Sequence, residues 1–191
     1  TLDDSVITAN IQFDTALDIS YSNISDITGI EDFSALKIFN CSNNLIDSMD
    51  MSSNLGLTKI YCDRNQLDSL DVSSNVALTY LECGFNSLIK LNLTANLALT
   101  NLYCNNNSLT SLDVSSNNVL SKCYTSNNLL DSIDVSSNFA LTSLDISNNS
   151  FDSMDVSSNS LLSIFYCTDN NLTKLDLSNN PALFYLKCSN N

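Results

Sequence analysis

The stretch LTKIYCDRNQLDSLDVSSNVA (57–77) returns with few changes as LTNLYCNNNSLTSLDVSSNNV (99–119). The repeat has a strict period of 21 residues, and nothing is inserted or lost between residues 36 and 191. Each unit divides into two similar halves, L-x-C-x-x-N-x-L and L-D-V-S-S-N-x-A. A fixed period of this length predicts a solenoid in which each unit forms one coil of a stack. The opening residues of the units are Leu36, Leu57, Leu78, Leu99, Leu120, Leu141, Leu162 and Leu183.

The hydrophobic pattern of a unit shows which side chains should form the core. When the opening Leu is counted as offset 0, apolar residues recur at offsets 0, 3, 5, 10, 13, 15 and 20. A single coil cannot bury this apolar edge, whereas coils stacked as parallel strands about 4.8 Å apart make one continuous core. Each buried Leu or Val then contributes roughly 1.5–3 kcal/mol. We expect short strands at offsets 2–6 and a second strand-like ladder near offsets 12–16.

Asn recurs at two fixed offsets where the chain should bend. An inward Asn at a bend can satisfy backbone N–H and C=O groups that the curvature leaves unpaired. Stacked copies of such a residue form a ladder, so the sequence predicts two Asn ladders. The copies at offset 8 are Asn44, Asn65, Asn86, Asn107, Asn128, Asn149, Asn170 and Asn191, and those at offset 18 are Asn54, Asn75, Asn96, Asn117, Asn138, Asn159 and Asn180.

The L-x-x-L-x-C-x-x-N-x-L pattern resembles the leucine-rich repeat, with Cys in place of Leu at one strand position. The nested 21-residue form, with LDVSSN as its second half, is similar to secreted leucine-rich repeat proteins of Gram-negative gliding and commensal bacteria. The resemblance covers residues 17–191. Within it, LDISYSNISDITGIEDFSAL (17–36) resembles the 22-residue internalin-type unit, with Ile24, Ile27, Ile30 and Phe33 pointing inward.

These patterns divide the chain into three parts. Residues 1–16 are expected to be the remnant of an N-terminal cap, and residues 17–35 the first, internalin-type repeat. Residues 36–191 hold seven complete 21-residue repeats and a partial eighth, with a C-terminal cap or domain absent. A raw solenoid end exposes core and usually needs a cap. We therefore expect a piece of a longer secreted protein.

The composition argues against several classes of function. The chain has 7 Lys and Arg against 21 Asp and Glu, for a net charge of −14, and it contains no His. Without His there is no His-based acid–base relay and no His-ligated metal. The negative charge repels nucleic acid and anionic lipid, and no apolar run is long enough to insert into a membrane. We expect no enzyme and no cofactor.

All seven cysteines are expected to point inward, and six of them fall in one column. Structural zinc needs thiolates wrapped around one point, and a disulfide needs Cβ atoms closer than neighbouring strands bring them. Thr125 and Ile146 fill the same offset in two units, so a small apolar side chain suffices there. We expect reduced cysteines packed in the core, with seven free thiols after denaturation. Six lie at offset 5 (Cys41, Cys62, Cys83, Cys104, Cys167, Cys188), and Cys123 lies at offset 3.

The outward side chains of the first half-repeat form the candidate binding surface. Offsets 2, 4, 6 and 7 should face outward on the concave sheet, where six of the seven Tyr residues occur. Tyr suits exposed strands, and aromatic cross-strand pairs stabilise sheets. Tyr is also enriched at binding hot spots because it offers rigid contact area and a hydroxyl. Both interpretations remain open for the candidate ligand-binding residues Tyr61, Arg64, Tyr80, Phe85, Tyr103, Tyr124, Tyr166 and Tyr185.

An acidic column runs along the second half-repeat at offset 14, interrupted by Asn92. Stacked carboxylates could hold Ca²⁺, which takes oxygen ligands. The same Asp side chains could equally accept hydrogen bonds from nearby Ser hydroxyls and turn amides, and no Gly-rich calcium loop accompanies them. The candidate calcium ligands are Asp50, Asp71, Asp113, Asp134, Asp155 and Asp176.

Asp-Ser/Thr-apolar triplets recur along the chain. They are similar to the O-glycosylation sequon of exported proteins in the bacterial group named above, although the triplet also belongs to the repeat consensus. Four of them place the hydroxyl at offset 12, away from the Tyr-bearing face. The candidate O-glycosylation sites are Ser5, Thr15, Ser48, Ser69, Ser132 and Ser153.

These observations together predict a right-handed, β-rich leucine-rich repeat solenoid with parallel strands, almost no α-helix and slight curvature. The expected function is a non-enzymatic recognition or adhesion module, secreted or on the outer surface of a Gram-negative bacterium. It would bind a protein or a glycan through its concave Tyr-bearing face, as part of a longer chain or larger complex. The alternative is a structural spacer or assembly component of a larger surface protein.

Overall fold

The computed structural model describes residues 11–191, so Ser5 and most of the expected cap remnant (1–16) lie outside the described residues. No helix within the described range is long and apolar enough to cross a membrane. The elements are a 3-10 helix, η1 (Ile30–Asp32), and nine strands: β1 (Ala16–Asp18), β2 (Ile38–Asn40), β3 (Lys59–Tyr61), β4 (Tyr80–Glu82), β5 (Asn101–Tyr103), β6 (Lys122–Tyr124), β7 (Ser143–Asp145), β8 (Ile164–Tyr166) and β9 (Tyr185–Lys187).

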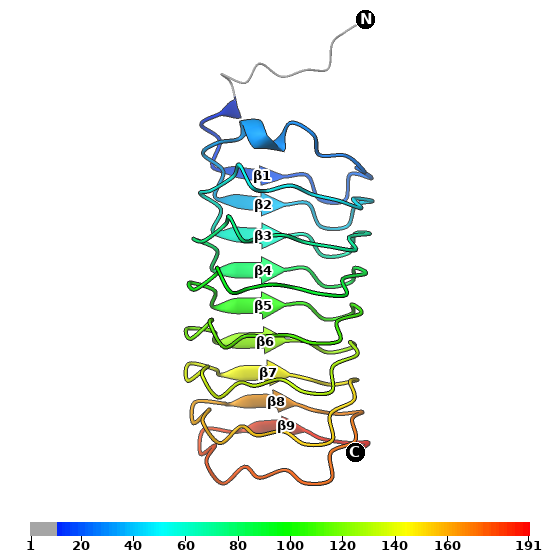
Figure 1. The fold of residues 1–191 in the computed structure, drawn as a ribbon, viewed down its shortest axis with the longest axis vertical. Helices are drawn as coiled ribbons and strands as arrows, with labels where there is room; N and C mark the ends of the chain where they lie inside the picture. The colour runs from blue at the N-terminus through cyan, green and yellow to red at the C-terminus, as the bar shows by residue number, and fades with distance from the viewer. Residues whose placement is uncertain (1–10) are drawn as a thin grey trace, which may run out of the picture.

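The nine strands form one parallel sheet in chain order (Figure 1). From β2 onward each strand pairs with the next at a register shift of 21 residues, as Ile38 does with Lys59. The pair β1–β2 is shifted by 22 residues, since Ala16 pairs with Ile38. The coils stack into a nearly straight column (Figure 1). The predicted solenoid of parallel strands with slight curvature and almost no helix is confirmed.

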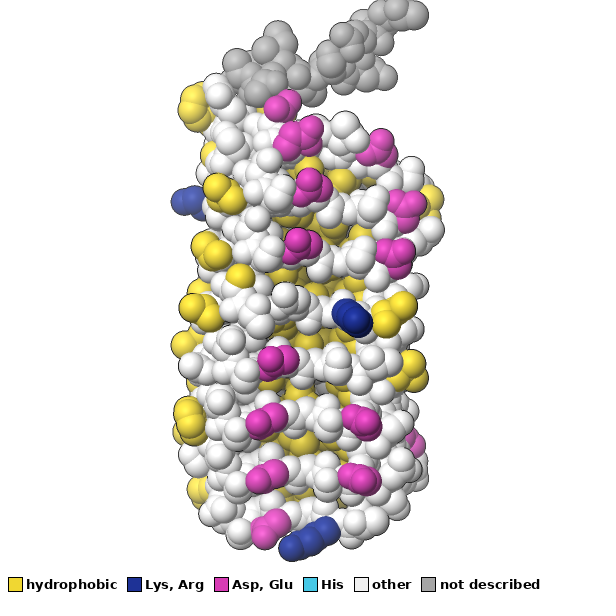
Figure 2. All heavy atoms as spheres, in the orientation of Figure 1, with side chains coloured by type: hydrophobic (Ala, Val, Ile, Leu, Met, Phe, Trp, Pro, Cys, Tyr) yellow, Lys and Arg dark blue, Asp and Glu magenta, His cyan; other side chains and the backbone are white. Residues whose placement is uncertain are grey.

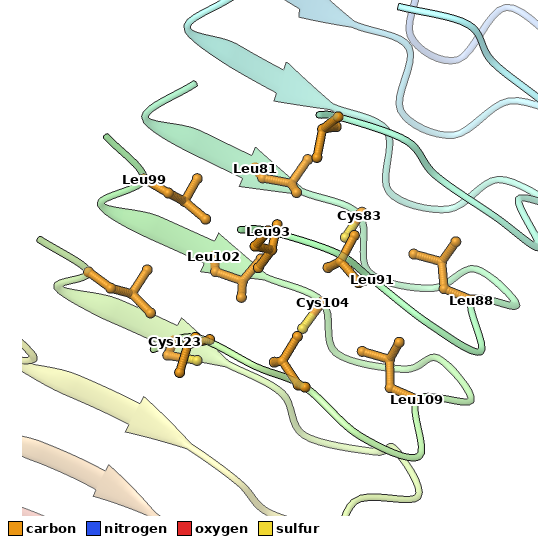
Figure 3. Packing of buried hydrophobic residues seen from close by; sticks show 14 of the residues in the cluster. Leu81, Cys83, Leu88, Leu91, Leu93, Leu99, Leu102, Cys104, Leu109 and Cys123 are labelled. Carbon is orange, nitrogen blue, oxygen red and sulfur yellow. The ribbon is translucent and has the colours of Figure 1, made fainter. Parts of the chain in front are cut away.

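The core lies between the strands and the returning half of each coil. In the coil that opens at Leu78, the side chains of Leu81, Cys83, Leu88 and Leu93 are 0–1% exposed. Figure 3 shows the corresponding side chains of neighbouring coils pointing into the same interior column. Burial therefore follows the offsets read from the sequence, because each coil covers the apolar edge of its neighbours.

The prediction of a second strand-like ladder near offsets 12–16 is wrong. The described residues contain no strand in that half of the coil, which is irregular and ends in a turn. Between coils, the returning half begins with one backbone hydrogen bond, as from Gln66 N–H to the Ile46 carbonyl at 2.8 Å. Further along, the backbone N–H at offset 16 is taken by the Asp side chain two residues earlier, as Asp71 Oδ1 accepts from Ser73 at 2.9 Å. Local turn bonds thus replace a second ladder.

The Asn ladder at offset 8 is present and fully hydrogen-bonded. Asn107 Nδ2 donates to the carbonyls of Cys83 in the preceding coil and Cys104 in its own, at 3.0 and 3.1 Å. Its Oδ1 accepts the backbone N–H of Leu88 at 3.0 Å. Each such Asn ties two coils together where the chain leaves the strand, as the sequence predicts.

The Asn ladder at offset 18 is also present, but it is only half hydrogen-bonded. Asn117 Nδ2 donates to the carbonyls of Leu93 and Asn96 in the preceding coil, at 3.1 and 2.9 Å. Its Oδ1 is buried and accepts no hydrogen bond within residues 11–191. The same holds for every Asn of this ladder (Asn54, Asn75, Asn96, Asn117, Asn138, Asn159, Asn180).

The first unit, 17–36, packs its apolar residues toward the stack to different degrees. Ile30 is buried, whereas Ile27 and Phe33 are partly buried against the core. Ile24 is half-buried at the upper end of the stack. Three of the four expected inward residues, Ile27, Ile30 and Phe33, therefore contact the core, whereas Ile24 is half-buried outside it.

Candidate recognition surface

Four tyrosines on β3–β6 form a continuous row of ring contacts on the outward face of the sheet. The ring centroids of Tyr61 and Tyr80 are 4.8 Å apart, those of Tyr80 and Tyr103 are 5.4 Å apart, and those of Tyr103 and Tyr124 are 5.0 Å apart. The rings are tilted against one another by 37–60°. We call Tyr61, Tyr80, Tyr103 and Tyr124 the tyrosine row. Such pairs stabilise the sheet beyond the area they bury.

Tyr80 joins the row from a different offset than its neighbours. In the register of the sheet, Tyr61 pairs directly with Glu82 and Glu82 pairs directly with Tyr103. Tyr80 stands two residues earlier on β4, and its ring fills the gap above Glu82. Its hydroxyl donates a hydrogen bond to Glu82 Oε2 at 2.8 Å. The row is therefore continuous although one coil lacks Tyr at offset 4.

Burial and the nearby carboxylate of Glu82 raise the pKa of two tyrosines of this row, Tyr61 and Tyr80. Burial raises the pKa of Tyr80, and the hydrogen bond to the charged Glu82 raises it further. The pKa of Tyr61 is also raised, first by burial and then by the charge of Glu82. At neutral pH both side chains therefore offer a neutral phenol to any ligand.

The remaining predicted tyrosines form a separate pair. Asp145 occupies offset 4 of β7 and interrupts the row. Beyond it, the rings of Tyr166 and Tyr185 meet edge to face at 5.5 Å. The Lys187 ammonium lies 5.5 and 5.7 Å from these two rings. The structure thus divides the eight predicted ligand-binding residues between two places.

Arg64 and Phe85 lie just beyond β3 and β4. The Arg64 guanidinium lies over the Phe85 ring, with its carbon 3.9 Å from the ring centroid. The Arg64 side chain is 51% exposed and Phe85 is 40% exposed. Both residues have positive φ angles, 55° and 52°. The sequence places both on the outward face but gives no sign that they stack.

The charges on the outward face of β3–β6 differ from those of the whole chain. Residues 59–64, 80–85, 101–106 and 122–127 contain three cations against two anions. The chain as a whole has a net charge of −14. Three of its seven cations therefore lie beside the tyrosine row, which is nearly neutral within a strongly acidic molecule. The charged residues are Lys59, Asp63, Arg64, Glu82 and Lys122.

The cysteine column packs in the core as expected, except at its end. Six of the seven free thiols are buried, whereas Cys188 in the last coil is exposed. Burial raises the pKa of Cys83 to about 12, with a smaller contribution from Glu82, and burial likewise raises the pKa of Cys123 to about 12. Thr125 and Ile146 are equally buried in the two units without a Cys at offset 5. The buried thiols are protonated core side chains at neutral pH.

The acidic column is built into turns. Each of the six Asp side chains at offset 14 accepts the backbone N–H of the Ser two residues later, at 2.8–3.0 Å. Hydrogen bonds from Ser115 hold the pKa of Asp113 below its usual range. Asn92 accepts the equivalent bond from Thr94 at 3.1 Å. Among residues 11–191, no group of three or more Asp, Glu or Cys side chains is placed to hold a metal ion.

The candidate glycosylation sites in the repeats are exposed. Ser48, Ser69, Ser132 and Ser153 each donate their hydroxyl to the preceding Asp at 2.8–3.0 Å. Figure 2 shows the acidic side chains of this half in two vertical columns on the face opposite the sheet. Thr15 is exposed near the first strand, and Ser5 lies outside the described residues.

One surface feature was not predicted. Exposed apolar side chains at offsets 19 and 20 follow the edge where the chain enters the strands, visible on the left of Figure 2. Their offset lies next to the buried opening Leu, so the sequence pattern alone does not separate them from the core. They are Leu55, Val76, Leu97, Val119, Phe139 and Leu161, exposed by 46–64%.

Solved structures with the same architecture include three from Listeria monocytogenes. The functional domain of InlJ, described as including a cysteine ladder, is 32% identical, and the match covers 95% of this chain and 50% of that chain, with a TM-score of 0.57. An internalin C2 structure is 20% identical over 96% of this chain and 84% of that chain, with a TM-score of 0.86. An internalin (inlF) is 17% identical over 96% and 64%, with a TM-score of 0.85.

The comparisons show the leucine-rich repeat fold. No protein-family model and no curated protein matches the chain. The chain spans half the length of the InlJ chain and about two thirds of the inlF chain. The shared architecture therefore extends through almost all of this sequence, while each of those two structures contains more chain than the match covers.

Proposed function

We propose that this chain is a non-enzymatic recognition module that binds a protein or a glycan through the outward face of β3–β6. The observation that carries the proposal is the tyrosine row, an unbroken line of ring contacts across four coils. Tyr side chains provide large, rigid contact area at low conformational cost and combine an apolar ring with a hydroxyl. A flat row of four is a surface for an extended partner.

The contrast between the constant residues that hold each coil together and the variable residues on the outward face supports this proposal. The inward residues, both Asn ladders and the turn carboxylates recur almost unchanged from coil to coil, because each of them holds the coil together. The outward residues of the strands change at every coil and are not needed for that purpose. A constant scaffold that carries a varied, solvent-facing row is the arrangement by which repeat proteins present extended binding surfaces.

The non-enzymatic part of the proposal rests on how the reactive groups are used. The buried thiols have raised pKa values, as Cys83 does, and are held as neutral core side chains. The carboxylates at offset 14 are occupied by turn amides in every coil where they occur. A general acid–base pair needs two groups whose environments move their pKa values apart. The repeated Asp residues have one environment and one direction of shift.

We infer that the chain works outside the cell, on the outer surface of a Gram-negative bacterium. The LDVSSN half-repeat, which resembles secreted proteins of that group, supports this location. O-glycans on Ser48, Ser69, Ser132 or Ser153 would project from the half of the coil that faces away from the sheet. Such glycans would leave the tyrosine row open.

A pull-down from host or environmental surface material tests the proposal. We expect a partner retained by the wild-type chain and lost with Tyr103→Ser/Tyr124→Ser. Tyr166→Ser is the matched control, because Tyr166 has the same offset but lies beyond Asp145. Since the rings contact one another, the melting temperature of each variant is measured alongside. Equal retention by wild type and the double variant would contradict the proposal.

A structural spacer is the second candidate function. The straight, uninterrupted stack with a constant 21-residue register favours it. A spacer needs length and rigidity but no ligand. If the wild-type chain retains no partner, and an unrelated solenoid of equal length replaces it without loss of function, the spacer is the correct assignment.

A further inference from the structure

The residue at offset 7 has the same unusual backbone conformation in every coil. Its φ lies between 52° and 57° in all eight units, in the left-handed region. Asn and Asp tolerate this region best among non-glycine residues, and six of the eight units use them. Two adjacent units use Arg and Phe instead. The residues are Asn43, Arg64, Phe85, Asn106, Asn127, Asn148, Asp169 and Asn190.

Arg64 and Phe85 are therefore strained where Asn would not be. A bulky side chain at positive φ is an outlier that persists only when the surroundings hold it or when function selects it. The frame of the coil does not require either residue, because six other units build the same bend with Asn or Asp. Strain of this kind clusters at binding sites.

The two strained residues form a rigid cationic platform. The guanidinium of Arg64 lies on the Phe85 ring at 3.9 Å, so one of its faces is covered. Asp63 approaches Nε only to 3.8 Å, which is beyond hydrogen-bonding distance. No hydrogen bond within residues 11–191 uses the guanidinium, so its N–H edge remains open. A planar guanidinium held in this way matches a carboxylate with two parallel N–H groups.

The platform adjoins the tyrosine row. Arg64 follows Tyr61 by three residues, and Phe85 follows the strand that carries Tyr80, whose ring lies 4.8 Å from that of Tyr61. The cation is thus next to aromatic surface, in the nearly neutral part of an acidic molecule. A negatively charged partner is repelled by the rest of the surface and attracted here, which restricts how it docks.

We propose that Arg64 and Phe85 form a binding site for a carboxylate side chain of an acidic protein partner, with the tyrosine row contacting its neighbouring apolar or aromatic residues. The site rests on the proposed recognition function and names the chemistry of the partner. Arg64 makes the bidentate contact, and Phe85 holds the guanidinium flat.

Arg64 is the only arginine in the sequence, so a single side-chain Nε–H signal in a proton–nitrogen NMR spectrum reports on this site. The probe is the dipeptide N-acetyl-Glu-Tyr-amide, and its matched control is N-acetyl-Gln-Tyr-amide. We expect a saturable shift of the Arg64 signal with the Glu probe, no shift with the Gln probe, and a several-fold weaker response in Phe85→Asn. No saturable shift, or equal shifts with both probes, would overturn the proposal.

A parallel titration with N-acetylneuraminic acid distinguishes a carboxylate on a protein from one on a sugar. A stronger response to the sugar acid than to the Glu probe would overturn the protein partner. The outcome is separate from the test of the tyrosine row. If the Tyr103→Ser/Tyr124→Ser variant retains the surface partner while the Arg64 signal still shifts with the Glu probe, the row fails and this site stands.

The strain has its own test, which needs no ligand. Arg64→Asn/Phe85→Asn restores the consensus at both positions, and we expect its melting temperature to rise by about 2–4 °C because the backbone strain is relieved. The matched control, Asn127→Arg/Asn148→Phe, moves the pair to two other coils and should lower it. If the restored variant melts at or below the wild type, the pair is structural and the proposal is wrong.

Discussion

The two halves of each coil follow different rules. In the strand half, only three residues pair with the next coil and their outward side chains change at every repeat, from Lys59 and Tyr61 to Tyr80 and Glu82. In the returning half there is no strand, and the same Asp, Ser and Asn residues form the same turn bonds in coil after coil. Hydrogen bonding by fixed side chains thus frees the strand half to vary.

The two Asn ladders also differ between the halves of the coil, in how many of their side-chain atoms form hydrogen bonds. The Asn side chains of the strand half use both their amide nitrogen and their oxygen, as Asn107 does with Leu88 and Cys83. Those of the returning half use only the nitrogen, and their buried oxygens have no partner in the described chain. The strand half is therefore locked more tightly between coils, which suits a surface that must keep its shape.

The largest expected effect is alkaline unfolding that starts in the strand half. Burial raises the pKa of Cys83 and Cys123 to about 12, from an ordinary value of 9.0. A folded thiol that holds its proton above the unfolded pKa stabilises the fold below pH 9, and this stability is lost as the pH rises toward 12. Each buried thiol should cost about 1 kcal/mol per pH unit in that window. Circular dichroism from pH 8 to pH 12 measures it.

Thiol labelling is the control for this prediction. Under native conditions at neutral pH an alkylating reagent should reach Cys188 and spare the six buried cysteines, and after denaturation it should label all seven. Rapid native labelling of several cysteines, or an unfolding curve that is flat between pH 9 and 12, would show that the column is not a sealed core.

Next in size is the difference between the two Asn ladders. Asn107→Ala leaves the Leu88 N–H without a partner. It also removes one of the two Asn hydrogen bonds to each of the carbonyls of Cys83 and Cys104. We expect a loss of about 3 kcal/mol. Asn117→Ala removes one hydrogen bond from each of the carbonyls of Leu93 and Asn96, which keep a backbone N–H donor. It also removes a buried oxygen that has no partner among residues 11–191, so we expect a loss of about 1 kcal/mol. Urea denaturation measures both. Equal losses, or the reverse order, would remove the distinction between the ladders.

The smallest expected effect lies in the acidic column. Asp113→Asn should shift the melting temperature by less than about 2 °C at pH 7, because Asn92 already accepts the same turn bond in a neighbouring coil. The pKa of Asp113 is lowered by Ser115, so its contribution is present above the ordinary carboxyl pKa and lost as the pH falls through the folded value. The variant should therefore lose less stability than the wild type on acidification.

Addition of Ca²⁺ or a chelator is the matching control for the column. We expect neither to move the melting temperature, because the carboxylate oxygens accept turn amides in each coil. A calcium-dependent rise in the wild type that Asp113→Asn/Asp134→Asn abolishes would make the column a calcium site and not only a set of turns.

The period of the repeat made most of the fold predictable. The burial of Leu81, Cys83 and Leu88 follows from their offsets alone, and so does the Asn ladder at offset 8. A repeat without insertions gives every coil the same conformation, so each offset has one environment. The prediction of a second ladder was wrong because it relied on the similar sequences of the two half-repeats. Their similarity conceals that the Asp side chain in LDVSSN captures the backbone N–H at offset 16 and ends the pairing.

The residues of the candidate site could be listed from the sequence, but their arrangement could not. Tyr61, Tyr103 and Tyr124 share offset 4 and so form one column on the outward face. Tyr80 is at offset 2 and belongs to a different column. Only the register and the bond to Glu82 show that its ring closes the row. The stacking of Arg64 on Phe85 depends on positive φ angles. A comparison of offset 7 between units could have identified these two as the residues that depart from Asn or Asp.

Hydroxyl-radical footprinting of the chain with its captured surface partner tests whether the partner binds the tyrosine row, because it compares the two halves of the coil in one experiment. We expect the partner to protect Tyr61, Tyr80, Tyr103 and Phe85 from oxidation. The half-buried Met49 and the exposed Ile89, both in the returning half, should react as they do in the free chain. Protection confined to the returning half, with the tyrosine row oxidised as before, would contradict this expectation.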